Sequence, residues 1–323
     1  MAIQLWSTNT AGGFMYSDEL SDQMRTDVRA QAKFRQLCDA QDFTDKGLGN
    51  GSLVTWNVYS KLATSGTTLG ETQAMPESNF TITQGTATVV EWGISVPFTS
   101  LLTKLAKHDV EKVVRDTLAR DAREVLDRAA HAEFNRTMLR YVAANGTTVP
   151  TLITNGTTTG TNNSALNKFH VRALVDTMKE RNIPTFAGDD YMAILRPTTL
   201  RPLRNELEAV NQYTETGYGK IMRGEVGRFE GCRFIEQTNV NRGVNNAGVA
   251  WTSNQSDWAY FFGADTVGEV IAEPMEVRGK IPSDFGRSHG IAWYAIEGFG
   301  IVYSAAADPT GLNSRIIKWD SAA

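Results

Sequence analysis

A long stretch almost without charge is the feature that most restricts how this chain can fold. Between Gly47 and Thr88 only Lys61, Glu71 and Glu77 are charged, while Gly, Ser and Thr are abundant. The stretch has too few apolar residues to form a core and too little charge for a free solvated loop. We therefore expect it to lie against a surface that it does not itself provide.

Two predicted strands enclose this stretch. The segments 52–60 (SLVTWNVYS) and 86–98 (TATVVEWGISVPF) are rich in β-branched and aromatic residues, and Trp56 and Val58 are expected to face the apolar residues of the second segment. A long two-stranded ribbon without a core is marginal in water. We expect this ribbon to lie on a second copy of the chain; a hairpin folded over its own domain is the alternative.

Residues 109–143 predict one long helix. Their apolar positions follow a 3.6-residue period, from Val110 and Val114 to Leu139 and Val142. Asp109 can cap the start of this helix, and Gly146 is a natural stop. About 35 residues at ~1.5 Å each give a length of roughly 50 Å. Because the apolar positions form no strict heptad, a single helix that supports other elements is favoured over a coiled coil.

The first 46 residues begin irregularly and then predict a short helix over 17–39, which packs either on its own body or on a neighbouring copy. Five basic side chains (Arg25, Arg29, Lys33, Arg35 and Lys46) stand against seven acidic ones in this segment. With a net charge of −4 for the whole chain, this balance argues against binding nucleic acid through charge.

The rest of the chain predicts a mixed α+β fold with mainly antiparallel strands. A neutral connector at 144–163 is followed by a helix that Ser164 caps and Pro184 ends. Further strands are expected at 191–196, 232–237, 257–263, 269–277 and 291–304, with a helix near 198–210. No apolar run reaches the length of a membrane span, and the two cysteines, Cys38 and Cys232, are expected to be reduced thiols.

No motif for chemistry emerges from the sequence. The four histidines, His108, His131, His170 and His289, form no cluster, and GxSxG and GxxxxGK[ST] are absent. TGYGK (216–220) and GEVGRFEG (224–231) are interpreted as turns, and the carboxylates of Asp189, Asp190, Asp308, Glu206 and Glu208 as solvated surface. We predict no catalytic, cofactor-binding or metal-binding residue, and no enzymatic activity.

In this order, the segments resemble the major capsid proteins of tailed phages of the Hong Kong 97 type, in particular the branch shared with N-four-like podoviruses. The stretches that carry the resemblance are GETQAMPESNFTITQGTATVVEWGISVPFT (70–99), RGEVGRFEGCRFIE (223–236), WAYFFGADTVGEV (258–270) and GIAWYAIEGFGIVYSAA (290–306). The resemblance extends over nearly the whole chain, and its specificity lies in the order of the elements.

The resemblance implies a Hong Kong 97-like capsid fold with five parts. These are an N-terminal arm (1–46), an extended loop (47–98), a peripheral domain (99–184) with a spine helix (109–143), an axial domain (185–290) and closing strands that return to the peripheral domain (291–323). Contacts between subunits are expected at Trp56, Lys61, Glu71, Glu77, Phe80, Arg25 and Arg29.

The implied function is self-assembly into the icosahedral head shell, as hexamers and pentamers that enclose double-stranded DNA without reading its sequence. The implied partners are a separate scaffolding protein, a portal and an optional decoration or cement protein, with no membrane. The shell is expected to form in the host cytoplasm and to belong to the virion. Isopeptide cross-linking, which the type member uses, is not expected here, because no asparagine partner or glutamate catalyst can be assigned to Lys61.

Two other functions remain open at this point. An encapsulin-like compartment protein would share the fold and would enclose enzymes in place of a genome. A phage tail or adhesin protein would form tubes or trimers and would lack the single long helix.

Overall fold

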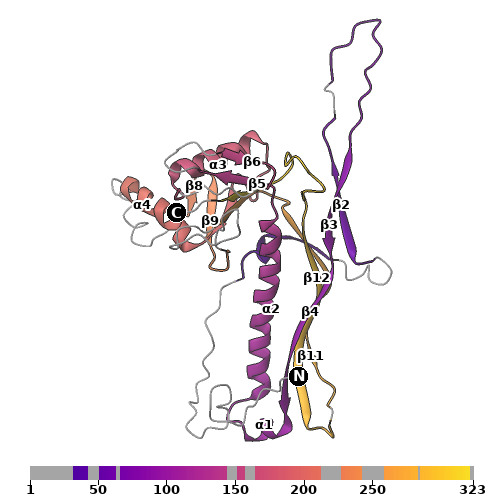
Figure 1. The fold of residues 1–323 in the computed structure, drawn as a ribbon, viewed down its shortest axis with the longest axis vertical. Coiled ribbons are helices and arrows are strands. Elements are labelled where there is room, and N and C mark those ends of the chain that lie inside the picture. Colours follow the sequence, from indigo (N-terminus) through magenta and orange to yellow (C-terminus); the bar gives the residue numbers. More distant parts are fainter. Residues whose placement is uncertain are drawn as a thin grey trace.

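The computed structural model describes residues 32–42, 51–62, 66–143, 151–156, 164–211, 227–241, 258–282 and 284–320. It consists of an elongated body, a compact lobe beside one end of that body, and a ribbon that projects beyond the same end (Figure 1). The predicted α+β class is confirmed, and the described residues form three sheets of four, seven and two strands.

The elongated body is a four-stranded sheet covered by one helix. The strand order is β1 (Asp39–Asp42), β11 (Val267–Gly279), β12 (Ser288–Ile301) and β4 (Val90–Thr99); β1 is parallel to β11 and the other pairs are antiparallel. The helix α2 (Val110–Asn135) runs along this sheet (Figure 1). A short helix, α1 (Ser100–Leu105), precedes it at the far end of the body.

Helix α2 buries one ridge of side chains spaced four residues apart. Its buried apolar residues are Val110, Val114, Leu118, Ala122, Leu126, Ala130 and Phe134. The Asp109 carboxylate accepts hydrogen bonds from the backbone N–H groups of Glu111 (3.0 Å) and Lys112 (3.3 Å), as predicted from the sequence. The first half of the ridge packs against Ile291, Trp293 and Ala295 of β12.

The predicted end of this helix at residue 143 is wrong. The helix ends at Asn135, and Leu139–Val142 form strand β5. Apolar residues at 138, 139 and 142 fit either a helix or a buried strand, so periodicity cannot distinguish the two. The strand is favoured because Thr137 donates a hydrogen bond to the carbonyl of Ile316 (2.6 Å), which directs Leu139 into register with Ile317.

The compact lobe is built on the seven-stranded sheet. Its strand order is β6 (Thr151–Ile153), β5, β13 (Ile316–Trp319), β10 (Ala259–Phe262), β7 (Tyr191–Leu195), β9 (Cys232–Glu236) and β8 (Arg228–Phe229). Helices α3 (Lys168–Glu180) and α4 (Pro197–Asn211) share a core with this sheet through Leu174, Met178, Leu200 and Leu203. Asn167, not the predicted Ser164, caps α3 by accepting a hydrogen bond from the N–H of His170 (3.0 Å).

A second core joins the lobe to the body. Phe34 is fully buried there between Phe134 of α2 and Tyr260 of β10. Residues 32–42, which we call the strap, therefore lie across the joint. The predicted helix over 17–39 is wrong within the described residues, because the strap has a single 3-10 turn at Arg35–Leu37 followed by β1; residues 17–31 lie outside the described part.

The ribbon consists of β2 (Leu53–Tyr59), β3 (Ile82–Thr88) and the chain between them. The predicted pairing of 52–60 with 86–98 is right only for residues 86–88: β2 pairs with β3, from Leu53 opposite Thr88 to Tyr59 opposite Ile82. The chain changes sheets at Val89, and β4 pairs with β12. The apolar run that starts at Val90 belongs to β4, which is covered by α2.

The residue ranges of the predicted domains do not coincide with the sheets. Strands β5 and β6 and helix α3, assigned to the domain of the long helix, belong to the seven-stranded sheet and its core. Strand β11, assigned to the axial domain, lies in the sheet of the elongated body, and β13 of the closing segment returns to the compact lobe. The strands of the four-stranded and seven-stranded sheets are interleaved along the chain, so no continuous residue range corresponds to either sheet.

Candidate functional site

The distal part of the ribbon, residues 66–81, extends away from the rest of its own chain (Figure 1). Every residue in this segment except Ser78 is exposed. The exposed fraction is 47% for Leu69, 75% for Met75 and 53% for Phe80. A segment that presents large apolar side chains to solvent marks an interaction surface.

The base of the ribbon, in contrast, packs tightly on β12 and the residues that follow it. A Cβ atom on Gly85 would lie 2.2 Å from the carbonyl oxygen of Val302, and one on Gly300 would lie 2.7 Å from the Cβ of Ala87. Thr83 donates a hydrogen bond to the carbonyl of Ala307 (2.6 Å). The ribbon therefore leaves the body in a fixed direction.

Trp56 is the predicted contact residue that the structure assigns to its own chain. Its indole N–H donates to the side-chain oxygen of Gln41 in β1 (3.3 Å). Its ring also fills the space beside Gly268, where a Cβ atom would lie 2.5 Å from the ring. Trp56 thus anchors the ribbon base to the strap and to β11.

The other predicted contact residues fall into two groups. Lys61, Glu71, Glu77 and Phe80 are all exposed on the ribbon. Arg25 and Arg29 lie outside the described residues. The prediction missed Tyr59, Leu69 and Met75, although a large apolar side chain in a weakly charged stretch is a visible signal for such a surface.

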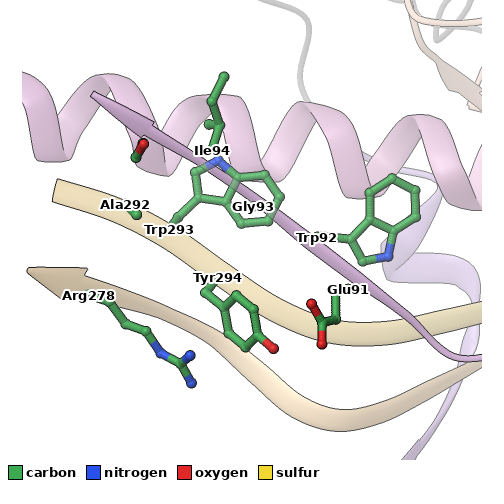
Figure 2. Close-up of a pocket in the computed structure, with 9 residues that line it drawn as sticks. Glu91, Trp92, Gly93, Ile94, Arg278, Ala292, Trp293 and Tyr294 are labelled. Carbon is green, nitrogen blue, oxygen red and sulfur yellow. The ribbon is translucent and has the colours of Figure 1, made fainter. Parts of the chain in front are cut away.

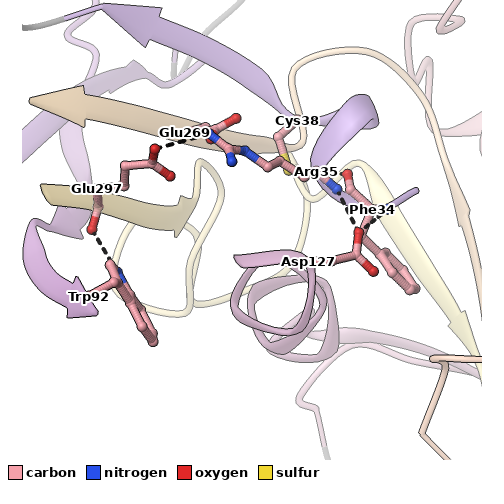
Figure 3. Close-up of polar contacts among 7 residues, drawn as sticks. All are labelled: Phe34, Arg35, Cys38, Trp92, Asp127, Glu269 and Glu297. Atoms are coloured by element: carbon pink, nitrogen blue, oxygen red, sulfur yellow. Dashed lines mark hydrogen bonds and ion pairs between the residues drawn. The ribbon is translucent and has the colours of Figure 1, made fainter. Parts of the chain in front are cut away.

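A buried charge cluster holds the strap in the joint (Figure 3). The Arg35 guanidinium lies 2.6 Å from the Glu269 carboxylate of β11 and 3.1 Å from the Glu297 carboxylate of β12. The Glu269 and Glu297 side chains are 4% and 0% exposed, so Arg35 compensates two carboxylates that are shielded from water. Burial raises the pKa of both glutamates, and the charge of Arg35 opposes this shift.

Asp127 of α2 fixes the strap from the other side. One of its oxygens accepts hydrogen bonds from the backbone N–H groups of Phe34 (2.8 Å) and Arg35 (3.2 Å). The other accepts from the side-chain amides of Gln237 (3.1 Å) and Asn239 (3.2 Å), at the end of β9. This one carboxylate therefore connects the long helix, the strap and the compact lobe.

A second buried polar group lies where α2 joins the compact lobe. Lys318 of β13 is fully buried; its amine donates to the side-chain oxygen of Asn135 (2.6 Å) and lies 3.1 Å from the centre of the Trp258 ring. Burial and the charge of Arg140 lower the pKa of Lys318 to about 6, against the opposing charge of Asp320. Nearby, His131 lies 3.1 Å from the Tyr260 hydroxyl, and burial lowers its pKa to about 4.

An open groove lies on the sheet of the elongated body, where β4, β12 and β11 run side by side (Figure 2). Trp293 packs into the core under α2, whereas the neighbouring Tyr294 lies against the Arg278 guanidinium, 3.9 Å from its ring centre. Arg278 also pairs with Glu273 and Glu276. Glu91 and Arg278 are the charged residues that line the groove.

The carboxylates considered as acid–base groups have structural partners. Asp190 is buried between Arg228 (2.6 Å) and Arg233 (2.7 Å), and the hydrogen bond from Arg233 lowers its pKa. Asp308 accepts backbone N–H hydrogen bonds from Leu312 (3.1 Å), Asn313 (2.6 Å) and Ser314 (3.0 Å). Both were interpreted as solvated surface, and that interpretation is wrong.

In the part of the chain that the structure describes, no group of three or more His, Cys, Asp or Glu side chains could hold a metal ion. Over the same residues, no helix combines the length and apolarity needed to cross a membrane. Both cysteines are free thiols, Cys232 buried and Cys38 partly so, as predicted. The exposed distal ribbon therefore remains the candidate functional site.

Comparisons with known proteins identify a family and a shared fold. The sequence profile of a family described as phage capsid protein matches residues 84–312. A search of curated sequences found no match. Among solved structures, the fold is similar to a chain of the cyanophage P-SCSP1u capsid, with a TM-score of 0.68, 13% identity, and coverage of 98% of this chain and 95% of that one.

Two further capsids give the same result. The Helicobacter pylori phage KHP30 capsid matches with a TM-score of 0.67, 14% identity, and coverage of 95% and 96% of the two chains. The Ralstonia phage GP4 capsid matches with a TM-score of 0.64, 15% identity and coverage of 98% of each. At identities this low, the structural likeness shows a shared fold and nothing further.

Proposed function

Because this chain belongs to the phage capsid protein family, we propose that it assembles the phage head by laying its distal ribbon on a neighbouring copy. The chain is a major capsid protein with a Hong Kong 97-like fold, and its role is structural. It is part of the virion, in an oligomeric icosahedral shell. The proposal concerns how the shell is held together and what it contains.

The exposure of Leu69, Met75 and Phe80 is the observation that carries this proposal. Full burial of a side chain of this size contributes about 1.5–3 kcal/mol. The hydrogen bonds described for the ribbon beyond its base are local, such as those between Gly70 and Gln73 and between Ser60 and Thr81. In a closed shell, a neighbouring subunit can bury these side chains of every copy. Many such modest contacts then add up.

We further propose that the compact lobe forms the axial domain, where hexamers and pentamers meet their axes, and that the elongated body forms the peripheral domain. The shell would enclose double-stranded DNA without reading its sequence. A separate scaffolding protein, a portal and an optional decoration or cement protein complete the proposed set of partners, and assembly takes place in the host cytoplasm. An encapsulin-like or tail function finds no support in the family match.

The test is to remove the distal ribbon while keeping its base. Residues 61–80 are replaced by Asn-Gly, which joins Ser60 to Thr81 across an existing backbone hydrogen bond (2.9 Å). We expect a folded protein that no longer forms shells in sedimentation and electron microscopy. Thermal unfolding is the control for the fold, and shells formed by this variant would refute the role of the ribbon.

A further inference from the structure

The strap contacts three parts of the chain over a short stretch of sequence. At its start, Lys33 donates a hydrogen bond to a backbone carbonyl of β9 (3.2 Å), and Phe34 enters the core that joins the lobe to the body. In its middle, the Arg35 side chain pairs with carboxylates of β11 and β12 (Figure 3). Near its end, Gln41 accepts the hydrogen bond from Trp56 of the ribbon base. The strap therefore connects the lobe and the body to the ribbon.

Backbone hydrogen bonds hold the strap at both ends. At the start, the Asp127 carboxylate of α2 accepts hydrogen bonds from the N–H groups of Phe34 and Arg35. At the end, β1 runs parallel to β11 in register with residues 268–271. A shift of the strap along β11 would break this register, because side chains of a strand change faces with every residue. A displacement at the lobe end is therefore transmitted to the ribbon end.

Each strand of the ribbon base has its own contact region on the body. Strand β3 packs on the end of β12, where Gly85 and Ala87 allow close backbone approach. Strand β2 contacts the strap and β11 through Trp56, whose ring lies against Gly268. Gly268 is also the register partner of Asp39 in the strap. The β3 contact fixes the point from which the ribbon starts, and the Trp56 contact fixes its rotation about that point.

From these contacts we infer that the strap and Trp56 form a latch, which sets the direction of the ribbon according to the position of the compact lobe. While the strap is seated in the joint, the ribbon projects as in Figure 1. When the strap leaves the joint, Trp56 loses its support on Gln41, and the ribbon turns about its β3 contact. The chain therefore has two states, latched and unlatched, that differ in the direction of the ribbon.

The latch deepens the proposed function and rests on it, because it regulates how readily the ribbon docks on a neighbouring copy. A latched ribbon has already lost the freedom that docking would otherwise remove, so it docks at a lower concentration of subunits. The coupling is reciprocal: docking in the latched direction favours the seated strap by the same factor. A subunit that joins a shell thereby also fixes its own lobe relative to its body.

Hydrogen exchange of the unassembled full chain tests the latch. Phe34→Ala weakens the lobe end of the strap, where Phe34 packs on α2 and β10. Because a two-stranded ribbon without support is marginal, the amides of β2 and β3 should exchange about tenfold faster, relative to those of β12. Phe261→Ala is the matched control: Phe261 is equally buried but belongs to the core that the lobe sheet shares with α3 and α4, and this ratio should not change.

The reverse measurement uses Trp56→Ala, which removes the ribbon end of the latch. It should speed exchange of the strap amides several-fold, although Phe34 and Arg35 donate to Asp127 and not to Trp56. The variant with both substitutions should exchange at the ribbon base no faster than the faster single variant, because two breaks in one coupled unit are not additive. Trp56→Ala also keeps the test valid if Phe34→Ala fails to fold.

Shell formation gives the second readout. The lowest concentration at which shells appear in sedimentation should rise about tenfold for Phe34→Ala and Trp56→Ala, and stay unchanged for Phe261→Ala. The latch is overturned if Phe34→Ala and Phe261→Ala change the exchange ratio equally, if Trp56→Ala leaves the strap unaffected, or if faster exchange comes with an unchanged threshold for shells. An unsubstituted chain that never forms shells overturns the proposed function itself, and the exchange measurements still decide the latch.

Discussion

Replacing Arg35 by leucine should destabilise the chain in a way that depends strongly on pH. Among the described residues, the substitution removes the cation that pairs with the buried carboxylates of Glu269 and Glu297. Removing one partner of a buried ion pair lowers the free energy of unfolding by about 3–5 kcal/mol, because the other charge stays buried without compensation. The chain can limit this cost by taking up a proton on each stranded glutamate.

The free-energy cost of protonating a glutamate follows from its ordinary pKa of 4.5. At about 1.4 kcal/mol per pH unit, protonating one carboxylate costs roughly 3.4 kcal/mol at pH 7 and roughly 0.7 kcal/mol at pH 5. The folded-state pKa of both glutamates is already raised, so their neutral forms favour the fold. That contribution is fully present below about pH 4.5 and is lost as the pH rises through the folded-state value.

We therefore expect Arg35→Leu to lower the free energy of unfolding by about 3 kcal/mol or more at pH 7, and by only about 1 kcal/mol at pH 5. Urea unfolding of the unassembled protein, followed by tryptophan fluorescence, measures both values. Arg115→Leu is the matched control, since it breaks an exposed pair with Glu111 that is worth at most about 1 kcal/mol. A loss that is equal at the two pH values, or larger at pH 5, would show that the carboxylates are not the cause.

Two further substitutions test the packing and the buried lysine. Gly85→Ala places a Cβ atom against the carbonyl of Val302 and should cost about 1–3 kcal/mol in urea unfolding, whereas Gly70→Ala, with open space around it, should cost far less; equal effects would refute the close contact. Lys318→Met should remove a stability increase of up to about 1.4 kcal/mol per pH unit above pH 6, because the unfolded chain, with a lysine pKa of 10.5, binds more protons than the folded one. Parallel pH profiles for this variant and the unsubstituted chain would contradict the lowered pKa.

The local sequence pattern was sufficient to predict the elements whose apolar residues are buried in the core. The start of α2 at Asp109 has a side-chain cap and an apolar ridge, and both are readable in sequence. The apolar runs of β7, β10 and β12 are readable in the same way, because these strands are buried. Where one run fits two structures, as at Leu139–Val142, only the partner strand β13 decides the outcome.

The charge cluster could not be assembled from the sequence, because Arg35 lies 234 positions from Glu269 and 262 from Glu297. One signal was nevertheless present. Glu297 stands within the apolar segment 291–301, and a carboxylate in a buried strand requires a partner. The sequence could have identified this need, but the identity of the partner depends on the path of the strap.

The ribbon shows why small residues in a predicted strand need a three-dimensional explanation. Strand β3 has weak apolar alternation and contains the small residues Gly85 and Ala87, and most of its pairing with β2 was missed. In the structure these two residues allow the ribbon base to approach Val302 and Gly300 closely. Their small size therefore makes the base rigid, since backbone fills the space that a side chain would occupy. A ribbon with a fixed direction loses less conformational freedom when it docks, so more of its apolar burial remains available to hold two subunits together.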